Sequence, residues 1–226
     1  MMLLSVFVVM VTGATAFSFK QLDGNSLDSQ PLIFHPHGYQ EALKKHPDFC
    51  NGLGCPDYSV VYENKTGKFE LREYAESEWV TTYSAGMDYD KAGYTNFRKL
   101  FNYIDGKNAK KEKVAMTCPV IVRVSPGPGP ACTSNFTMSF FVDPAAKTPP
   151  KPSTEDIYMT TIPALKAYVR TFSGFADYDK YKEQGLELIA AIGNPSLYIS
   201  DYYYTAGYDS PFKLLNRHNE VWLIAK

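Results

Sequence analysis

A four-residue motif that occurs twice sets the strongest limit on the fold of this chain. Residues 88–91 read Asp-Tyr-Asp-Lys, and residues 177–180 repeat the same amino acids. Each copy follows an aromatic stretch typical of a strand, at residues 79–83 and 168–172, and opens a stretch with helical periodicity. Because one strand-helix-strand half leaves a sheet face bare, two halves should close around a shared core. We therefore predict an α+β fold, with a curved antiparallel-rich sheet or distorted β-barrel flanked by two α-helices.

The sequence also predicts the bounds of these helices and of the strands. The first helix begins at the N-cap residue Asp88 and ends before Asp105, and the second begins at Asp177 and ends at Gly193. The expected core face of the first helix consists of Gly93, Phe97, Leu100, Phe101 and Ile104. Short strands are expected at residues 58–62, 69–74, 78–84, 113–124, 136–142, 157–161, 167–173, 198–205 and 220–225.

The chain ends in an apolar segment. Residues 203–226 read YYTAGYDSPFKLLNRHNEVWLIAK, which combines a strand, an irregular crossing and a closing strand at residues 221–225. Chain ends are normally frayed and polar, so this end is expected to be a buried strand of the sheet.

This closing segment resembles the signature of the SOUL heme-binding protein family. Three earlier segments match that family in order: residues 69–74 read FELREY, residues 113–120 read KVAMTCPV and residues 170–175 read RTFSGF. The resemblance begins at about residue 58, so residues 58–226 are identified as a SOUL-type heme-binding domain. It implies the same curved sheet with two outer helices, and a protein that binds heme and other porphyrins.

The N-terminal region predicts export. Residues 1–16 are interpreted as a signal peptide, because an apolar run is followed by Ala-Thr-Ala, a pattern that signal peptidase accepts. An uncleaved anchor is the alternative, but the run is shorter than the roughly 20 apolar residues that span a bilayer. We expect a secreted, extracellular protein in which residues 17–57 form an extended arm. In the secretory pathway the sequons at Asn64 and Asn135 become candidate glycosylation sites, with Asn64 at the tip of an expected hairpin.

Four cysteines form an even set, as expected for disulfides in an exported protein: Cys50, Cys55, Cys118 and Cys132. We prefer to pair Cys50 with Cys55 and Cys118 with Cys132, since each bridge closes a short loop. Crossed pairing, which ties the N-terminal segment to the Pro-Gly loop at residues 125–130, is an alternative. Structural zinc is disfavoured by the spacing of the cysteines. Familiar cytosolic members of the family have Ala where Cys118 stands, which links this chain to an exported branch.

Charge and motifs exclude several other functions. A net charge of −1 and a pI of about 6.4 do not supply the field that neutralises phosphates, so neither nucleic acid nor an anionic membrane is expected as a partner. The sequence has no nucleophile elbow, phosphate-binding loop, zinc helix or dinucleotide fingerprint. We therefore expect a protein that is not an enzyme. Its protein partners cannot be inferred.

The resemblance places the porphyrin on an apolar cleft beside the first helix and near the loop before the final strand. The corresponding residues are Tyr94, Phe97, Arg98 and Phe101 on the helix, and Lys213, Leu214, Leu215 and Arg217 in the loop. A porphyrin is a flat apolar plate with two carboxylates, so apolar faces with one or two cations are the required chemistry. The helix residues could instead be a core stripe.

The resemblance also raises the question of an iron ligand. One branch of the family has a proposed axial histidine on the second strand, where this chain has Glu73. Carboxylate is a poor heme ligand compared with imidazole, so packing would have to hold the heme. The leading hypothesis is a secreted, non-enzymatic binder or carrier of heme or a related tetrapyrrole. The alternatives are an extracellular interaction or structural protein on the same fold that has lost its ligand, and an enzyme that acts on a porphyrin or hydrophobic small molecule.

Overall fold

The computed structural model describes residues 46–129, 132–146 and 148–226. Its elements are η1 (Asp48–Cys50), β1 (Tyr58–Asn64), β2 (Phe69–Tyr74), β3 (Ser77–Gly86), α1 (Tyr89–Ile104), β4 (Val120–Ser125), β5 (Ser134–Phe141), β6 (Ile157–Ile162), β7 (Leu165–Phe172), α2 (Tyr178–Ile192), η2 (Pro195–Leu197), β8 (Tyr203–Gly207) and β9 (Asn219–Ile224). The expected signal peptide and most of the expected arm therefore lie outside the described residues. Within the described part, no helix is long and apolar enough to cross a membrane.

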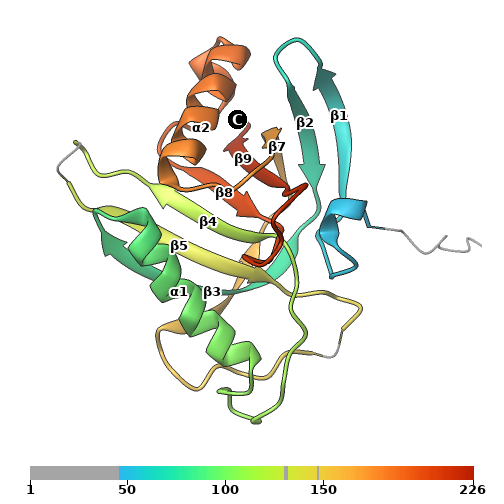
Figure 1. Ribbon diagram of the computed structural model, residues 1–226, viewed down its shortest axis with the longest axis vertical. Coiled ribbons are helices and arrows are strands. Elements are labelled where there is room, and N and C mark those ends of the chain that lie inside the picture. The colour runs from blue at the N-terminus through green and yellow to red at the C-terminus, as the bar shows by residue number, and fades with distance from the viewer. Residues whose placement is uncertain (1–45, 130–131, 147) are drawn as a thin grey trace, which may run out of the picture. The chain divides into compact units, whose positions relative to one another are not determined.

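The strands form one antiparallel sheet in the order β1-β2-β7-β9-β8-β4-β5-β3-β6. The sheet curls into a half-barrel, with α1 packed on β3 and β5 and α2 packed on β7 and β9 (Figure 1). Each half contains four strands and a helix, β2-β3-α1-β4-β5 and β6-β7-α2-β8-β9. The first strand of each half pairs with the second strand of the other, β2 with β7 and β6 with β3. The predicted α+β fold is confirmed. Its two halves exchange their first strands, since β2 lies in the sheet beside the second half and β6 lies beside the first.

The two copies of the repeated motif form equivalent helix starts. The Oδ1 atoms of Asp88 and Asp177 each accept a hydrogen bond, 2.9 Å long, from the backbone N–H three residues later. Such caps satisfy donors that have no partner within the first turn of a helix. The rings of Tyr89 and Tyr178 stack with their centroids 5.0 Å apart. The motif therefore starts both helices and also joins the two halves.

The buried face of α1 differs from the predicted one. Its buried residues are Ala92, Asn96, Leu100, Tyr103 and Ile104. Asn96 can lie in the core because its amide donates a 3.1 Å hydrogen bond to the carbonyl of Phe136 on β5. Phe97 is only partly buried, and Phe101 is 45% exposed. The expectation of a core role is therefore wrong for Phe101, whose side chain lies toward the outer side of the helix.

Two strands are shorter than predicted. The strand expected at residues 113–124 begins only at Val120, because Pro119 has no N–H to donate to a sheet ladder. The strand expected at residues 198–205 begins at Tyr203, and before it Tyr198 forms a single bridge with Ala225. The other expected strands lie within a few residues of their predicted places.

The segment before β1 packs on the inner face of the sheet, which is the face away from the helices. Cys50 and Cys55 are buried there in one cluster with Tyr74, Trp79 and Trp222. The two cysteines form a disulfide, as predicted. The end of the predicted arm is thus a loop, closed by a short bridge, that packs on the core.

The second predicted disulfide is wrong, because Cys118 and Cys132 are both free. Cys118 lies before the first residue of β4, and Cys132 lies in the loop after its last residue. The six residues of β4 alone span about 20 Å. Since a disulfide requires Cα atoms within about 7 Å, these cysteines cannot pair across the strand.

Candidate functional site

The four helix residues predicted to bind a ligand form one stripe on α1. Tyr94, Phe97, Arg98 and Phe101 are spaced so that they share a helix face. The rings of Phe97 and Phe101 stack with centroids 5.9 Å apart, and Arg98 Nη1 donates to the Tyr94 hydroxyl over 3.3 Å. Tyr94 is 66% exposed and Phe101 45% exposed. We call this set the outer stripe of α1; it offers apolar rings and a cation to solvent.

The second helix shows that the fold does not require such a stripe. When the two motif copies are aligned, the outer stripe corresponds to Glu183, Leu186, Glu187 and Ala190 of α2. These positions carry two carboxylates and no ring, although α2 packs on its half of the sheet as α1 does. The aromatic and cationic character of α1 is therefore a property of this face and not of the architecture.

The four predicted loop residues lie between β8 and β9. Leu214 and Leu215 are 71% and 78% exposed. The cations of the loop hold its backbone: Arg217 donates to the carbonyls of Ser210 and Lys213 over 2.7 Å. The Lys213 ammonium lies 2.5 Å from the Asp209 carboxylate. Burial would raise the pKa of Asp209, but hydrogen bonds from Lys213 and from the backbone N–H of His218 outweigh it and hold that pKa below its usual range.

The two predicted groups are anchored to different parts of the protein. The outer stripe is linked to the sheet through Phe97, whose ring lies 5.5 Å from that of Phe140 on β5. The loop contacts the segment before β1 through Asn51, which donates to Asp209. It contacts the connection between β7 and α2 through Arg217, whose guanidinium lies 4.6 Å from the ring of Phe175. Between the described residues, no hydrogen bond, ion pair or ring contact joins the stripe to the loop.

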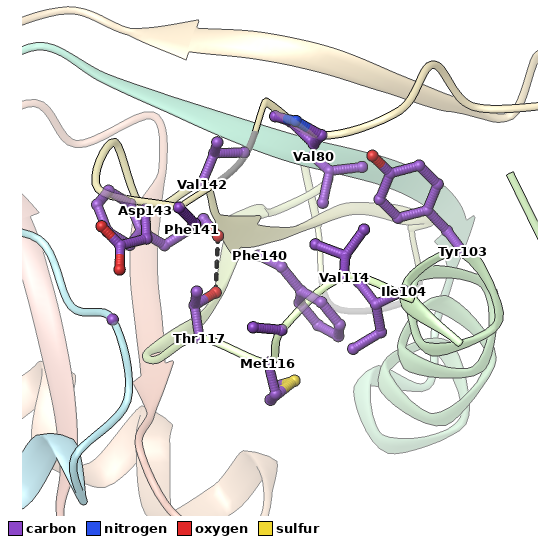
Figure 2. Close-up of a pocket in the computed structure, with 14 residues that line it drawn as sticks. Val80, Tyr103, Ile104, Val114, Met116, Thr117, Phe140, Phe141, Val142 and Asp143 are labelled. Carbon is purple, nitrogen blue, oxygen red and sulfur yellow. Dashed lines mark hydrogen bonds between the residues drawn. The ribbon is translucent and has the colours of Figure 1, made fainter. Parts of the chain in front are cut away.

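A small pocket lies near the C-terminal end of α1, beside the end of β5 (Figure 2). Its lining is mainly apolar and includes Val80, Tyr103, Ile104, Val114, Met116, Phe140, Phe141 and Val142. The free volume is about 60 Å³, whereas small-molecule sites usually offer roughly 300 Å³ or more. None of the eight predicted residues lines it. A porphyrin does not fit there, so the exposed surfaces are the better candidates for a planar ligand.

A more open depression of about 330 Å³ lies beside the β1–β2 hairpin. Six of its eight lining residues are charged or polar, among them Glu63, Lys65, Lys68 and Glu70. An apolar macrocycle would gain little from this surface, because burying unpaired polar groups costs free energy.

The residue in the position of the family's proposed iron ligand is on the surface. Glu73 on β2 is exposed, and its carboxylate lies 3.7 Å from the ammonium of Lys166 on β7. The Nε2 atom of His218 lies 2.7 Å from Oε1 of Glu220 and is engaged there. Among the described residues, His46 lies 4.0 Å from Asp57. None of these positions presents a free imidazole to the outer stripe of α1.

Sequence reasoning missed a buried polar cluster on the inner face. The carboxylate of Glu220 is fully buried and has four partners, Arg72 at 2.9 Å, Tyr208 at 2.9 Å, Trp222 at 2.8 Å and His218 at 2.7 Å. Burial alone would raise the pKa of Glu220, but the hydrogen bond from His218 and the charge of Arg72 outweigh it, so the pKa is lowered. A glutamate inside the apolar closing strand was the available signal, since a buried carboxylate must have partners.

The two sequons lie on the described part of the chain. Asn64 ends β1, and its Oδ1 accepts a 2.7 Å hydrogen bond from the backbone N–H of Gly67 in the hairpin turn, which is the predicted place. Asn135 is exposed on β5.

Comparisons with known proteins show the family to which the chain belongs. Residues 53–224 match the family model described as SOUL heme-binding protein. Over 162 residues the chain is 42% identical to Heme-binding protein 2 of Homo sapiens, which covers 71% of this chain and 79% of that protein. It is 31% identical over 157 residues to Heme-binding protein 1 of Xenopus laevis, covering 69% and 83% respectively. The solved C-terminal domain of EcmrR has a TM-score of 0.54 at 12% identity, covering 70% of this chain and 96% of that one, which shows a shared fold.

Proposed function

Since the chain belongs to the SOUL heme-binding protein family, we propose that it binds heme or a related tetrapyrrole on the outer stripe of α1. The observation that carries this proposal is the exposed aromatic and cationic face of α1, which the equivalent helix α2 lacks. The relatives named for heme binding support the ligand class.

The residues of the stripe suit the chemistry of a porphyrin. The stacked rings of Phe97 and Phe101 offer an apolar surface on which a flat macrocycle can lie. Arg98, held beside Tyr94, can pair with a propionate carboxylate through a charge-assisted hydrogen bond. With Glu73 in place of histidine, iron ligation does not contribute at that position. Packing and charge therefore supply the affinity.

The proposed role is that of a secreted, glycosylated carrier without catalytic turnover. Its support comes from the N-terminal apolar run, the two sequons and the Cys50–Cys55 disulfide, since disulfides persist in oxidising compartments. The second hypothesis, an extracellular interaction or structural protein that has lost the ligand, is favoured by the ion-paired Glu73.

A hemin titration followed by the Soret band distinguishes the two hypotheses. A carrier gives a saturable shift near one equivalent, and Phe101→Ala or Arg98→Gln weakens binding about two- to tenfold through loss of a ring contact or a charge pair. Leu186→Ala is the matched control, because it truncates the exposed α2 residue equivalent to Phe97 and should leave the titration unchanged. A featureless rise that albumin competes away, with no difference between variants, would remove the carrier hypothesis.

A further inference from the structure

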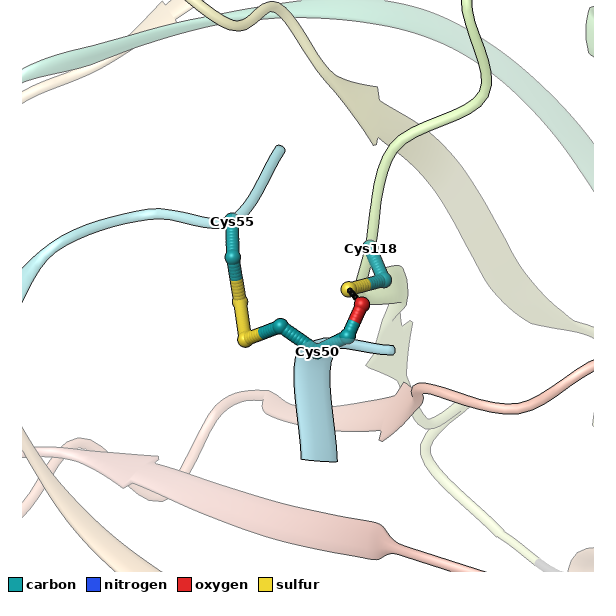
Figure 3. A group of neighbouring side chains, drawn as sticks. All are labelled: Cys50, Cys55 and Cys118. Atoms are coloured by element: carbon teal, nitrogen blue, oxygen red, sulfur yellow. Dashed lines mark hydrogen bonds between the residues drawn. A yellow bond between two sulfur atoms is a disulfide. The ribbon is translucent and has the colours of Figure 1, made fainter. Parts of the chain in front are cut away.

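Three sulfur atoms lie together in the core beneath the segment that precedes β1. The Sγ atoms of Cys50, Cys55 and Cys118 all lie within 4.8 Å of one another, and their residues are at most 3% exposed. Figure 3 shows Cys118 beside the Cys50–Cys55 disulfide, with its thiol directed toward the Cys50 carbonyl. The cluster thus contains one bridge and one free thiol.

Backbone contacts hold the free thiol in this place. Residues Gly54 and Thr117 form a parallel bridge, and the N–H of Cys118 donates to the Gly54 carbonyl over 2.9 Å. The Cys118 thiol in turn donates to the Cys50 carbonyl over 3.3 Å. Since Gly54 is the neighbour of Cys55, the segment before β4 is tied to the disulfide loop itself. An exchange between these sulfurs therefore needs no large movement of the chain.

We propose that Cys50, Cys55 and Cys118 form an internal thiol–disulfide exchange site. The thiolate of Cys118 attacks one sulfur of the Cys50–Cys55 bridge, a new bond forms from Cys118 to that sulfur, and the other cysteine leaves as a thiolate. The proton released by Cys118 is taken up by the leaving cysteine. The step neither consumes nor produces electrons, so it requires no oxidant or reductant, and it does not depend on the proposed function.

The burial of the cluster keeps the exchange slow. Burial, with smaller contributions from the charges of Asp209 and Glu220, raises the pKa of the Cys118 thiol to about 12. Only the thiolate is nucleophilic, so the Cys50–Cys55 bridge persists at neutral pH once formed.

The exchange changes what the bridge connects. Cys50 and Cys55 lie five residues apart, so their bridge closes only a local loop. A bridge to Cys118 instead joins the segment before β1 covalently to the start of β4 in the sheet. This segment is otherwise held on the inner face without a covalent link, by hydrogen bonds such as that from the Cys118 N–H to Gly54 and by packing such as the stack of Phe49 on His218 with centroids 3.9 Å apart.

Disulfide mapping tests the proposal. In Cys132→Ser, which removes the exposed fourth cysteine, the folded protein is incubated for days without oxygen at the most alkaline pH at which it stays folded, and is then alkylated and digested without reduction. We expect peptides that link Cys118 to Cys50 or Cys55, a matching loss of the Cys50–Cys55 peptide and an unchanged number of thiols. Cross-linked peptides that form only in urea, or none at all, would refute the proposal, because exchange would then require unfolding.

Two further variants test each new bridge separately. Cys55→Ser and Cys50→Ser, each combined with Cys132→Ser, leave Cys118 with a single partner. Mild oxidation by a small-molecule disulfide such as oxidised glutathione should then close the corresponding bridge in the folded protein. If both variants retain two free thiols after oxidation, the sulfurs do not meet and the proposal fails. If either variant does not fold, the disulfide mapping of Cys132→Ser alone still tests the proposal.

Discussion

Replacing Arg72 by methionine tests whether the buried polar cluster stabilises this fold. Arg72 is 3% exposed, and its Nη1 lies 2.9 Å from Glu220, whose carboxylate is fully buried. Methionine fills much of the same space but leaves the Glu220 carboxylate without the charge of Arg72. Removing one partner of a buried ion pair typically costs about 3–5 kcal/mol. That is a large share of the roughly 5–15 kcal/mol by which domains are stable.

Urea unfolding measures this loss. At a slope of about 2 kcal/mol per M, the expected midpoint of Arg72→Met is about 1.5–2.5 M below that of the unmodified protein. The control is Lys166→Met, which removes the exposed ion pair with Glu73 on the neighbouring strand. An exposed pair contributes at most about 1 kcal/mol, so this midpoint should shift by less than about 0.5 M.

The pH dependence of the same variant tests the cause. The lowered pKa of Glu220 means that its contribution is present above the unfolded pKa, near 4.5, and is lost as the pH falls through the lower folded value. Without the charge of Arg72, the pKa of Glu220 should rise relative to that in the unmodified protein, although the hydrogen bond from His218 still lowers it, so Glu220 of the variant takes up its proton at a higher pH. The difference in unfolding free energy between the two proteins should therefore be largest near pH 7 and shrink as the pH falls through the folded pKa of Glu220, first in the variant and then in the unmodified protein. A difference below about 1 kcal/mol, or one that does not change with pH, would refute this reasoning.

Three other predictions concern the repeat and the surface. Asp88→Ala and Asp177→Ala should each lower the unfolding free energy by about 1 kcal/mol in urea, and unequal losses would argue against equivalent caps. Tyr89→Phe removes a 2.7 Å hydrogen bond to a β8 hydroxyl and should cost about 1 kcal/mol; an unchanged midpoint contradicts that. After expression through a secretory pathway, Asn64→Gln and Asn135→Gln should each lower the mass by one glycan, and a glycan-free parent protein would contradict both.

Local signals in the sequence were sufficient to predict the helices and most strands. Asp88 and Asp177 start the helices, and Gly193 ends the second in a left-handed conformation with φ of 70°. These features depend on the chemistry of a few neighbouring residues. The exchange of β2 and β6 between the halves could not be predicted, because strand partners are chosen by the assembled sheet.

The site was predictable only in part, for the same reason. The residue types of the outer stripe follow from the sequence, but the exposure of Phe101 depends on how α1 is turned against the sheet. The prediction that Cys118 pairs with Cys132 was wrong, because a short spacing along the chain does not mean a short distance when a whole strand lies between the two residues. The cluster around Glu220 joins residues more than a hundred positions apart, which no local pattern contains.

The exchanged strands also limit how this polypeptide could be divided. A cut between β5 and β6 would give two fragments, each holding a leading strand whose place is in the other fragment's sheet. Neither fragment could complete its own sheet alone. Two copies of a single half could satisfy the same pairings as a twofold-symmetric dimer, so the protein has the geometry of such a dimer fused into one continuous chain.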